Sequence, residues 1–177
     1  MNVTTDILKT ARDYHDYVRR KSNAHYLMSE AAKSRHNQLG VPVTIVTAVV
    51  GTSIFATLNA PGQYFWIRIA AGLLSLGAAV LAALQTFFNY SEVVAQHKKS
   101  AADYESVRHE LDRFLLYYGG GGGESQGEKA IEALKAIADR MDEIAQVSPS
   151  IPDSVYNVVR AREAMALAKA AETAEKK

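Results

Sequence analysis

Charged and apolar residues are segregated along this chain. Between His36 and Glu92 the only charged side chain is Arg68, whereas charged residues are frequent on both sides of this interval. Two uncharged runs, 39–58 and 69–91, each reach the ~20 residues that a helix needs to cross a hydrocarbon core. The polar residues within the runs are threonine, serine, glutamine and asparagine, so neither run has a face suited to water.

Three interpretations of these runs differ in what surrounds them. A soluble helical hairpin would need a large core around it, and a chain of 177 residues can hardly cover two helices that are apolar on every side. A cleaved signal peptide would have its apolar run closer to the N-terminus, followed by a small-residue cleavage motif. We therefore expect an all-α membrane protein, a two-transmembrane helical hairpin with spans at about 39–58 and 67–90.

The residues around the runs are typical of a hairpin in a bilayer. Asn59-Ala-Pro-Gly-Gln63 is a turn sequence, so the spans should be antiparallel neighbours. Aromatic residues at both ends of the second span are typical of the membrane–water interface, and a nearby arginine can extend to the headgroups. The predicted interface anchors are Tyr64, Trp66, Arg68, Phe87 and Tyr90.

Basic residues near the ends of the spans predict their orientation. They precede the first span and follow the second, and the connecting turn has none. By the positive-inside rule both termini should be cytoplasmic, with the tip of the hairpin outside. The basic residues are Arg19, Arg20, Lys21, Lys33, Arg35, Lys98, Lys99 and Arg108.

Both spans continue into long helical extensions, at 6–36 and 92–118. Apolar residues recur there at intervals of three and four, and no proline occurs between Gln63 and Tyr118, so we expect the second span and its extension to form one helix. The extensions should emerge side by side in the cytoplasm and bury their apolar stripes against each other. The stripes are Ile7, Ala11, Tyr14, Val18, His25, Met28 and Ala32, and then Val94, His97, Ala101, Tyr104, Val107, Leu111, Phe114 and Tyr118.

The rest of the chain forms a C-terminal part. A run of glycines opens a linker, and it lacks the Lys-Ser/Thr pair of a phosphate-binding loop. Two helices should follow and pack on the extensions or on a neighbouring subunit. The predicted domains are a two-transmembrane domain at 1–118, a glycine-rich linker at 119–127 and C-terminal cytoplasmic helices at 128–177.

The sequence shows no pattern of catalytic or metal-binding residues. There is no cysteine, and no two histidines have the helical spacing of a metal site. The carboxylates are scattered over solvated faces, and the net charge of +1 gives no reason to expect nucleic acid. We expect a non-enzyme without cofactor or metal. The histidines are His15, His25, His36, His97 and His109.

Rows of small residues in both spans predict helix packing. In lipid, close packing of small residues draws helices together, because burial of apolar surface no longer does so. One row can serve the contact within the hairpin and the other a neighbouring copy, so we expect a homo-oligomer. The candidate packing residues are Thr44, Ala48, Thr52 and Ala56, and then Ala71, Ser75, Ala79 and Ala83.

A second stripe on the later span is a candidate pore lining. Its residues are small or mildly polar, and several copies around an axis could enclose a water-filled path with them. The same residues also suit packing, with hydroxyl groups bonded to the carbonyl one turn back. The candidate pore-facing residues are Gly72, Ser75, Ala82, Gln85, Thr86, Asn89 and Glu92.

Several segments together resemble a known family. They span nearly the whole chain and are similar to the SLATT family, the SMODS- and SLOG-associating two-transmembrane effector domains. The segments are Leu39-Gly-Val-Pro42, Gly51-Thr-Ser-Ile-Phe55, Leu74-Ser-Leu76, Leu81-x-x-Leu-Gln-Thr-Phe-Phe-Asn89, His97-x-x-x-Ala-Ala-x-Tyr104 and Ser148-Pro-Ser-Ile-Pro152.

The resemblance implies a membrane effector of a prokaryotic conflict or anti-phage defence system, located in the cell inner membrane. It implies as partners the lipid bilayer, further copies of the chain and a cytoplasmic sensor or second-messenger system. We expect an oligomeric effector that forms pores or disrupts the membrane and is gated from the cytoplasmic side. The alternative is a non-conducting membrane anchor or scaffold that recruits a cytoplasmic partner.

Overall fold

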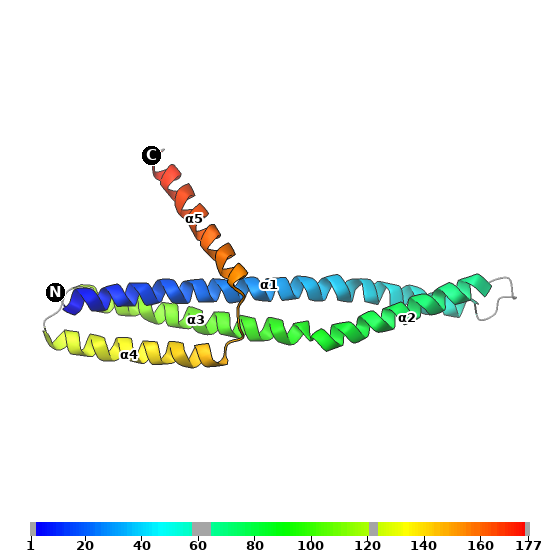
Figure 1. The fold of residues 1–177 in the computed structure, drawn as a ribbon, viewed down its shortest axis with the longest axis horizontal. Helices are drawn as coiled ribbons and strands as arrows, with labels where there is room; N and C mark the ends of the chain where they lie inside the picture. The colour runs from blue at the N-terminus through cyan, green and yellow to red at the C-terminus, as the bar shows by residue number, and fades with distance from the viewer. Residues whose placement is uncertain (1–2, 58–64, 121–123, 176–177) are drawn as a thin grey trace. The chain divides into compact units, whose positions relative to one another are not determined.

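The chain folds into helices, and the part that the structure describes contains no strand. The computed structural model describes residues 3–57, 65–120 and 124–175, and within them all side chains except those of residues 3–4, 53–57, 67–68, 124–125 and 175. The predicted all-α class is thereby confirmed. The helices are α1 (Val3–Thr57), α2 (Phe65–Phe88), α3 (Tyr90–Tyr118), α4 (Glu124–Val147) and α5 (Asp153–Glu175) (Figure 1).

The helices are divided between two compact units. The bundle unit contains residues 1–29 and 95–177, and the apolar unit contains residues 30–94. Because α1 is long, it contributes its first part to the bundle unit and the rest to the apolar unit. The structure therefore groups most of both predicted extensions with the C-terminal helices.

The core of the bundle unit lies between α1, α3 and α4, which run side by side in Figure 1. The predicted stripes of α1 and α3 face each other, and α4 covers them with an apolar face of its own. Arg140 of α4 forms an ion pair with Glu110 of α3 at the rim of this core. The core residues are Ile7, Ala11, Val18, Tyr104, Val107, Leu111, Phe114, Ala130, Leu134, Ile137, Met141 and Ile144.

The last helix, α5, is held to the bundle near its start and then leaves it at an angle (Figure 1). Val159 is its one buried residue among those described. The carboxylate of Glu163 lies 3.5 Å from Arg19 and 3.3 Å from Arg20 of α1. Farther along, the apolar side chains of Met165 and Leu167 are exposed.

In the apolar unit, the later part of α1 packs against α2. Val50 and Ala78 are buried there. Gly40 lies against the Gln85 side chain of α2, and a Cβ atom at position 40 would lie 3.0 Å from its Nε2. A larger residue at position 40 would therefore push the Gln85 side chain aside.

A break at Asn89 separates α2 from α3, so the prediction of one continuous helix is wrong. Asn89 has a φ of 41°, a left-handed conformation that asparagine adopts more readily than most residues. Its carbonyl accepts hydrogen bonds from the N–H groups of Glu92 and Val93 at 3.0 and 3.3 Å, and α3 begins from these bonds. The absence of proline did not predict a continuous helix correctly, because asparagine can interrupt a helix without one.

The glycine run ends α3. The N–H of Gly119 donates a hydrogen bond of 2.9 Å to the carbonyl of Leu115, and a Cβ atom at position 119 would collide with that oxygen. Residues 121–123 of the predicted linker lie outside the described residues. The next helix begins at Glu124, earlier than predicted, and an acidic residue is favourable at a helix N-terminus.

Candidate membrane surface and histidine pair

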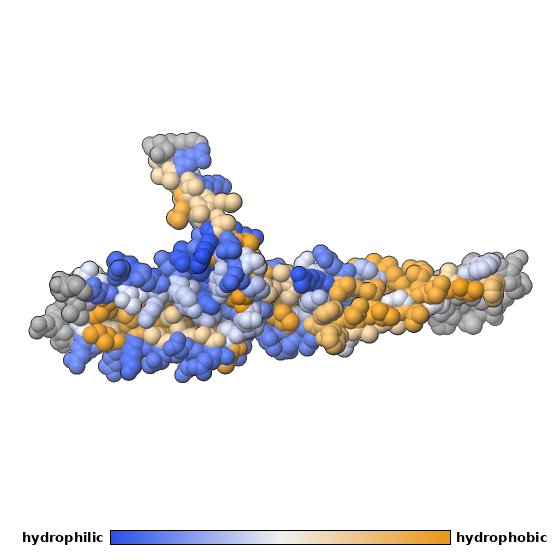
Figure 2. All heavy atoms as spheres, viewed as in Figure 1, coloured by the Kyte–Doolittle hydropathy of each residue, from blue (hydrophilic) through white to orange (hydrophobic). Residues whose placement is uncertain are grey.

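The apolar side chains of the apolar unit are mostly exposed. The stretch Ile69–Tyr118, which includes the break at Asn89, contains an 18-residue window that is apolar enough to cross a membrane, and only 6% of that window is buried. Figure 2 shows these side chains as an orange surface. The core helix of a soluble protein would be covered by other elements, and soluble proteins rarely expose large continuous apolar patches. Exposed apolar residues include Val41, Ile45, Val49, Leu73, Leu74, Leu76, Val80, Leu81 and Leu84.

The first predicted span, 39–58, is described only in part. The side chains of residues 53–57, and residue 58 as a whole, lie outside the described part of the chain. Among the described residues, the stretch Ile69–Tyr118 is the single candidate for a membrane span. The structure thus supports one candidate span.

Exposed aromatic residues stand at both ends of α2. The side chains of Trp66 and Phe87 are 76% and 81% exposed. They are about 32 Å apart along the helix at 1.5 Å per residue, close to the ~30 Å of a hydrocarbon core. Tyr90 is half-buried beside Phe88, with ring centroids 5.6 Å apart. The side chains of the other two predicted anchors, Tyr64 and Arg68, lie outside the described part.

Among the described side chains, the predicted packing rows contribute only in part to the contact between α1 and α2. Ala48 is exposed, and so are Thr44 and Thr52, whose hydroxyls donate to carbonyls of their own helix at 2.9 and 2.8 Å. The side chain of Ala56 lies outside the described residues. In the second row Ala71 and Ser75 are half-buried, whereas Ala79 and Ala83 are exposed.

Most members of the predicted pore stripe are exposed on α2, whereas Asn89 lies at the break between the helices and Glu92 lies on α3. Ser75 and Gln85 are half-buried, and the Thr86 hydroxyl donates to the carbonyl of Ala82 at 3.1 Å. The Thr86 hydroxyl thus bonds to the carbonyl one turn back, which is the alternative to lining a water-filled pore. The exposed members of the stripe are Gly72, Ala82, Thr86, Asn89 and Glu92.

Residues outside both predicted rows line the groove between α1 and α2. Val43 and Val46 of α1 face Gly77, Ala78 and Leu81 of α2 across it. The uncharged run of α1 and the whole of α2 after Arg68 are apolar on every side, so periodicity alone could not select this face.

A pair of buried histidines is the most distinctive polar feature of the bundle unit. His25 of α1 and His97 of α3 are 1% and 3% exposed, and their Nδ1 atoms lie 2.9 Å apart. At this distance one Nδ1 must donate a hydrogen bond and the other must accept it. The donor ring therefore carries its proton on Nδ1, and the neutral acceptor ring carries its proton on Nε2.

The surroundings of the pair favour neutral rings. Burial, the neighbouring His97 and the Lys21 ammonium lower the pKa of His25 to about 4. Burial also lowers the pKa of His97. A second proton on the pair would direct two N–H groups at each other inside the protein, where a charge without a partner is costly.

Small residues allow α1 and α3 to approach closely at the pair. The Ser22 hydroxyl donates to the carbonyl of Ala101 at 3.1 Å, and Ala24 and Ala101 are fully buried. The Tyr104 ring stacks on His25 with centroids 5.7 Å apart. The pair is thus part of a closely packed contact between two helices.

Spacing along a single helix does not reveal this pair, because the two histidines lie on different helices. The two histidines are 72 residues apart in the sequence. Each lies in a predicted apolar stripe, and this position in a buried stripe was the sequence feature that could have indicated the pair. Within the described ranges no three His, Cys, Asp or Glu side chains are grouped to hold a metal ion. The pair alone lacks the three protein ligands of a typical zinc site.

Comparisons of this chain with protein families, with curated proteins and with solved structures find no match.

Proposed function

We propose that the chain is a multi-pass protein of the cell inner membrane, with a hairpin of two spans and both termini in the cytoplasm. The observation that carries this proposal is the exposed apolar surface of α2 between aromatic residues at its two ends. The second span rests on the uncharged run at 39–58, and the orientation rests on basic residues that flank the spans.

In this proposal several copies assemble into a pore or disrupt the membrane. Two helices per chain cannot enclose a path, so the small residues exposed on both helices would contact neighbouring copies. Ala79 and Ala83 of α2, and Thr44 and Ala48 of α1, are free for such contacts within the described structure.

The role in prokaryotic conflict rests on the resemblance to the SLATT family. The chain would be a non-enzymatic effector, and the bundle unit would receive the signal of a cytoplasmic sensor or of a second messenger. The unit offers a defined helical core for that purpose, with α5 extending from it.

Ion flux tests the proposal. Full-length protein is reconstituted into liposomes loaded with a fluorescent dye, and dye release and membrane potential are measured as protein density rises. We expect dye release to increase more than linearly with protein density, because each pore needs several copies of the chain. Liposomes that hold both dye and potential at all densities would contradict the proposal.

A hairpin exchange separates the pore from a scaffold. Residues 39–90 are replaced by an unrelated two-span anchor, and toxicity in the host cell is measured. A pore-forming effector should lose its toxicity, whereas a scaffold that only recruits a partner should retain it.

A further inference from the structure

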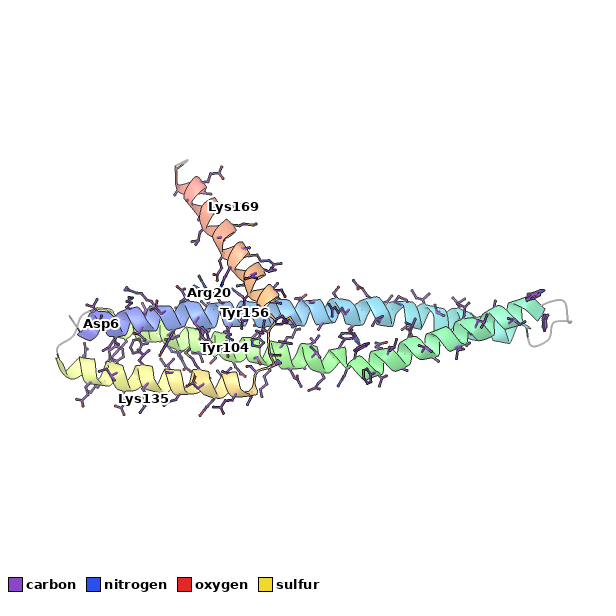
Figure 3. All side chains as sticks on the ribbon, in the orientation of Figure 1. Asp6, Arg20, Tyr104, Lys135, Tyr156 and Lys169 are labelled. Atoms are coloured by element: carbon purple, nitrogen blue, oxygen red, sulfur yellow. The ribbon has the colours of Figure 1, made fainter. Side chains whose placement is uncertain are left out.

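A small cleft opens between the start of α5 and the first part of α1, within the bundle unit. Its volume is about 220 Å³, below the roughly 300–1,000 Å³ of pockets for drug-sized ligands. Figure 3 labels Arg20 and Tyr156 on the two helices that form it. The lining residues are Tyr17, Arg20, Lys21, Tyr156, Val159 and Arg160.

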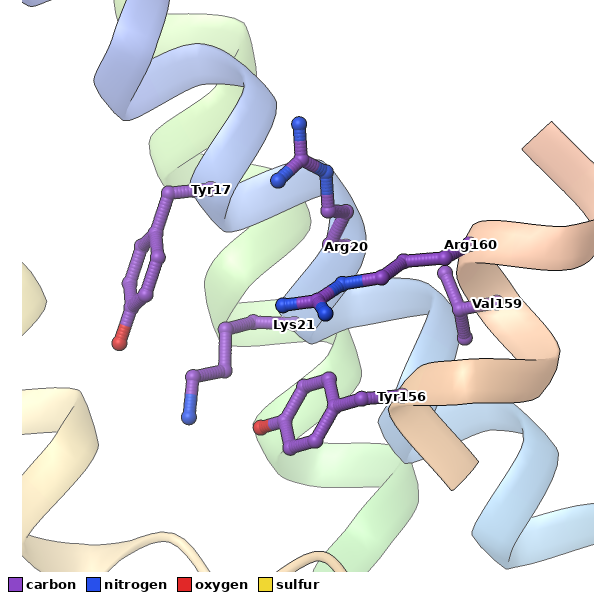
Figure 4. A pocket seen from close by; sticks show the side chains of 6 residues that line it. All are labelled: Tyr17, Arg20, Lys21, Tyr156, Val159 and Arg160. Atoms are coloured by element: carbon purple, nitrogen blue, oxygen red, sulfur yellow. The ribbon is translucent and has the colours of Figure 1, made fainter. Parts of the chain in front are cut away.

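The polar lining of the cleft is cationic and aromatic, and no carboxylate lines it within the part of the chain that the structure describes. Figure 4 shows Lys21 between the rings of Tyr17 and Tyr156, and its Nζ lies 5.5 and 5.1 Å from their centroids. Partial burial opposes the charge of Lys21, but its hydrogen bond with Tyr156 and the nearby phenols raise its pKa overall. Lys21 is therefore a fixed positive charge at neutral pH.

The carboxylate nearest to the cleft, that of Glu163, does not satisfy all the hydrogen-bond donors of Arg20. The buried Nε of Arg20 lies 3.3 Å from Glu163 but has no hydrogen-bond partner in the described structure. Oε1 of Glu163 is likewise buried and unbonded, although Arg19 lies 3.5 Å away. Arg160 extends from α5 toward α1 (Figure 4), and it has no ion pair among the described residues. The cleft thus has an excess of donors and of positive charge.

We propose that this cleft binds a phosphoryl group through Arg20, Lys21 and Arg160. A phosphoryl group presents three oxygens, enough for all three cations, whereas a carboxylate presents two. Guanidinium groups bind phosphate in a planar fork, and an ammonium adds a point charge. The small volume suits one phosphoryl group with a small attached moiety. If that moiety is planar, a tyrosine ring of the cleft can stack on it.

The group could come from a soluble phosphorylated metabolite or from a lipid headgroup. Binding does not require the protein to conduct ions, and only the use of binding as a trigger rests on the proposed function. If the chain binds phosphate but releases no dye from liposomes, the proposed pore function is contradicted and the phosphoryl site is supported.

Calorimetry tests the site on the full chain in an uncharged detergent. Inorganic phosphate, adenosine monophosphate and acetate are titrated separately, with and without phosphatidylglycerol in the micelles. We expect saturable phosphate binding and acetate affinity at least about tenfold weaker, since acetate lacks the third oxygen. Competition by phosphatidylglycerol would assign the site to lipid, and its absence would assign the site to a soluble ligand.

Two neighbouring arginines give a matched pair of variants. Arg160→Ala should weaken phosphate binding about tenfold, whereas Arg162→Ala removes the same charge from an exposed position outside the cleft and should change it less than about twofold. Arg160→Lys should restore part of the loss. No saturable binding, acetate binding equal to phosphate, or equal losses in the two alanine variants would overturn the proposal.

Discussion

The Nδ1 atoms of His25 and His97 lie 2.9 Å apart inside the bundle unit, where both rings are almost fully buried. Each ring supplies what the other lacks, one a donor and the other an acceptor. The pair thereby stabilises the observed register of α1 against α3, because a shift of either helix would leave two buried nitrogens without partners.

The pair predicts that acid destabilises the bundle unit. The pKa of His25 is about 4 in the folded chain and about 6.5 in an unfolded one. The neutral ring therefore contributes stability above about pH 6.5, and this contribution is lost as the pH falls toward 4, by about 2 kcal/mol at pH 5. Thermal unfolding followed by circular dichroism should show a lower Tm at pH 5 than at pH 7.5.

Variants separate the pair from other titrating groups. Lys21 and Tyr104, the ionisable neighbours of His25 besides His97, do not titrate between pH 5 and 7.5. His25→Gln keeps a donor for His97 and should reduce the pH dependence of Tm, leaving the part that comes from the buried His97. His109→Gln, at an exposed histidine outside the pair, is the control and should change this pH dependence less than His25→Gln does. Equal pH dependence in both variants would mean that surface carboxylates cause the effect.

The close contact of α1 and α3 predicts a contrast between neighbouring alanines. Ala101 is fully buried beside Ser22, whereas Ala102 is exposed. Ala101→Leu should destabilise the bundle by about 1–3 kcal/mol through overpacking, and Ala102→Leu by less than about 0.5 kcal/mol. Both are measured by thermal unfolding. Equal effects would show that the helices do not approach closely at Ala101.

The proposed assembly predicts a second contrast between alanines, on α2. Ala79 lies in a predicted packing row and is exposed in the single chain, and Ala70 is exposed on the opposite side of the same helix. Ala79→Leu should reduce oligomer mass and dye release, because added bulk separates packed helices. Ala70→Leu should change neither.

Oligomer mass is read by native mass spectrometry from detergent, and dye release from liposomes. Loss of assembly in both variants would point to a general effect of added leucine. An unchanged Ala79→Leu protein would remove this row from the interface.

Local pattern was enough to predict much of this fold. The stripes of α1 and α3 place Val18, Tyr104 and Leu111 on the faces that the structure buries together. Apolar periodicity works there because each helix has one buried and one solvated face. The break at Asn89 was missed because no proline or glycine marks it, and the choice of a left-handed asparagine depends on local backbone bonding.

Contacts between distant segments were harder to predict. Two histidines 72 residues apart are in contact because α1 and α3 pack in one particular register. A single sequence does not determine that register. In the apolar unit every face of α2 is apolar, so the stripe pattern could not choose Ala78 over Ala79 for the contact with α1. The cleft near Arg160 likewise depends on the angle at which α5 leaves the bundle.

The insertion of the apolar unit into a bilayer is the central claim, and cysteine labelling tests it most directly. The chain has no cysteine, so single variants can be labelled without background. Asn59→Cys lies at the predicted outer tip, and Ser154→Cys lies on α5, which should be cytoplasmic. Intact cells are treated with a membrane-impermeant maleimide, and lysed cells serve as the control.

We expect the Asn59→Cys protein to be labelled in intact cells and the Ser154→Cys protein only after lysis. Labelling of Ser154→Cys in intact cells, or recovery of the unlabelled chain in the soluble fraction without detergent, would contradict the account.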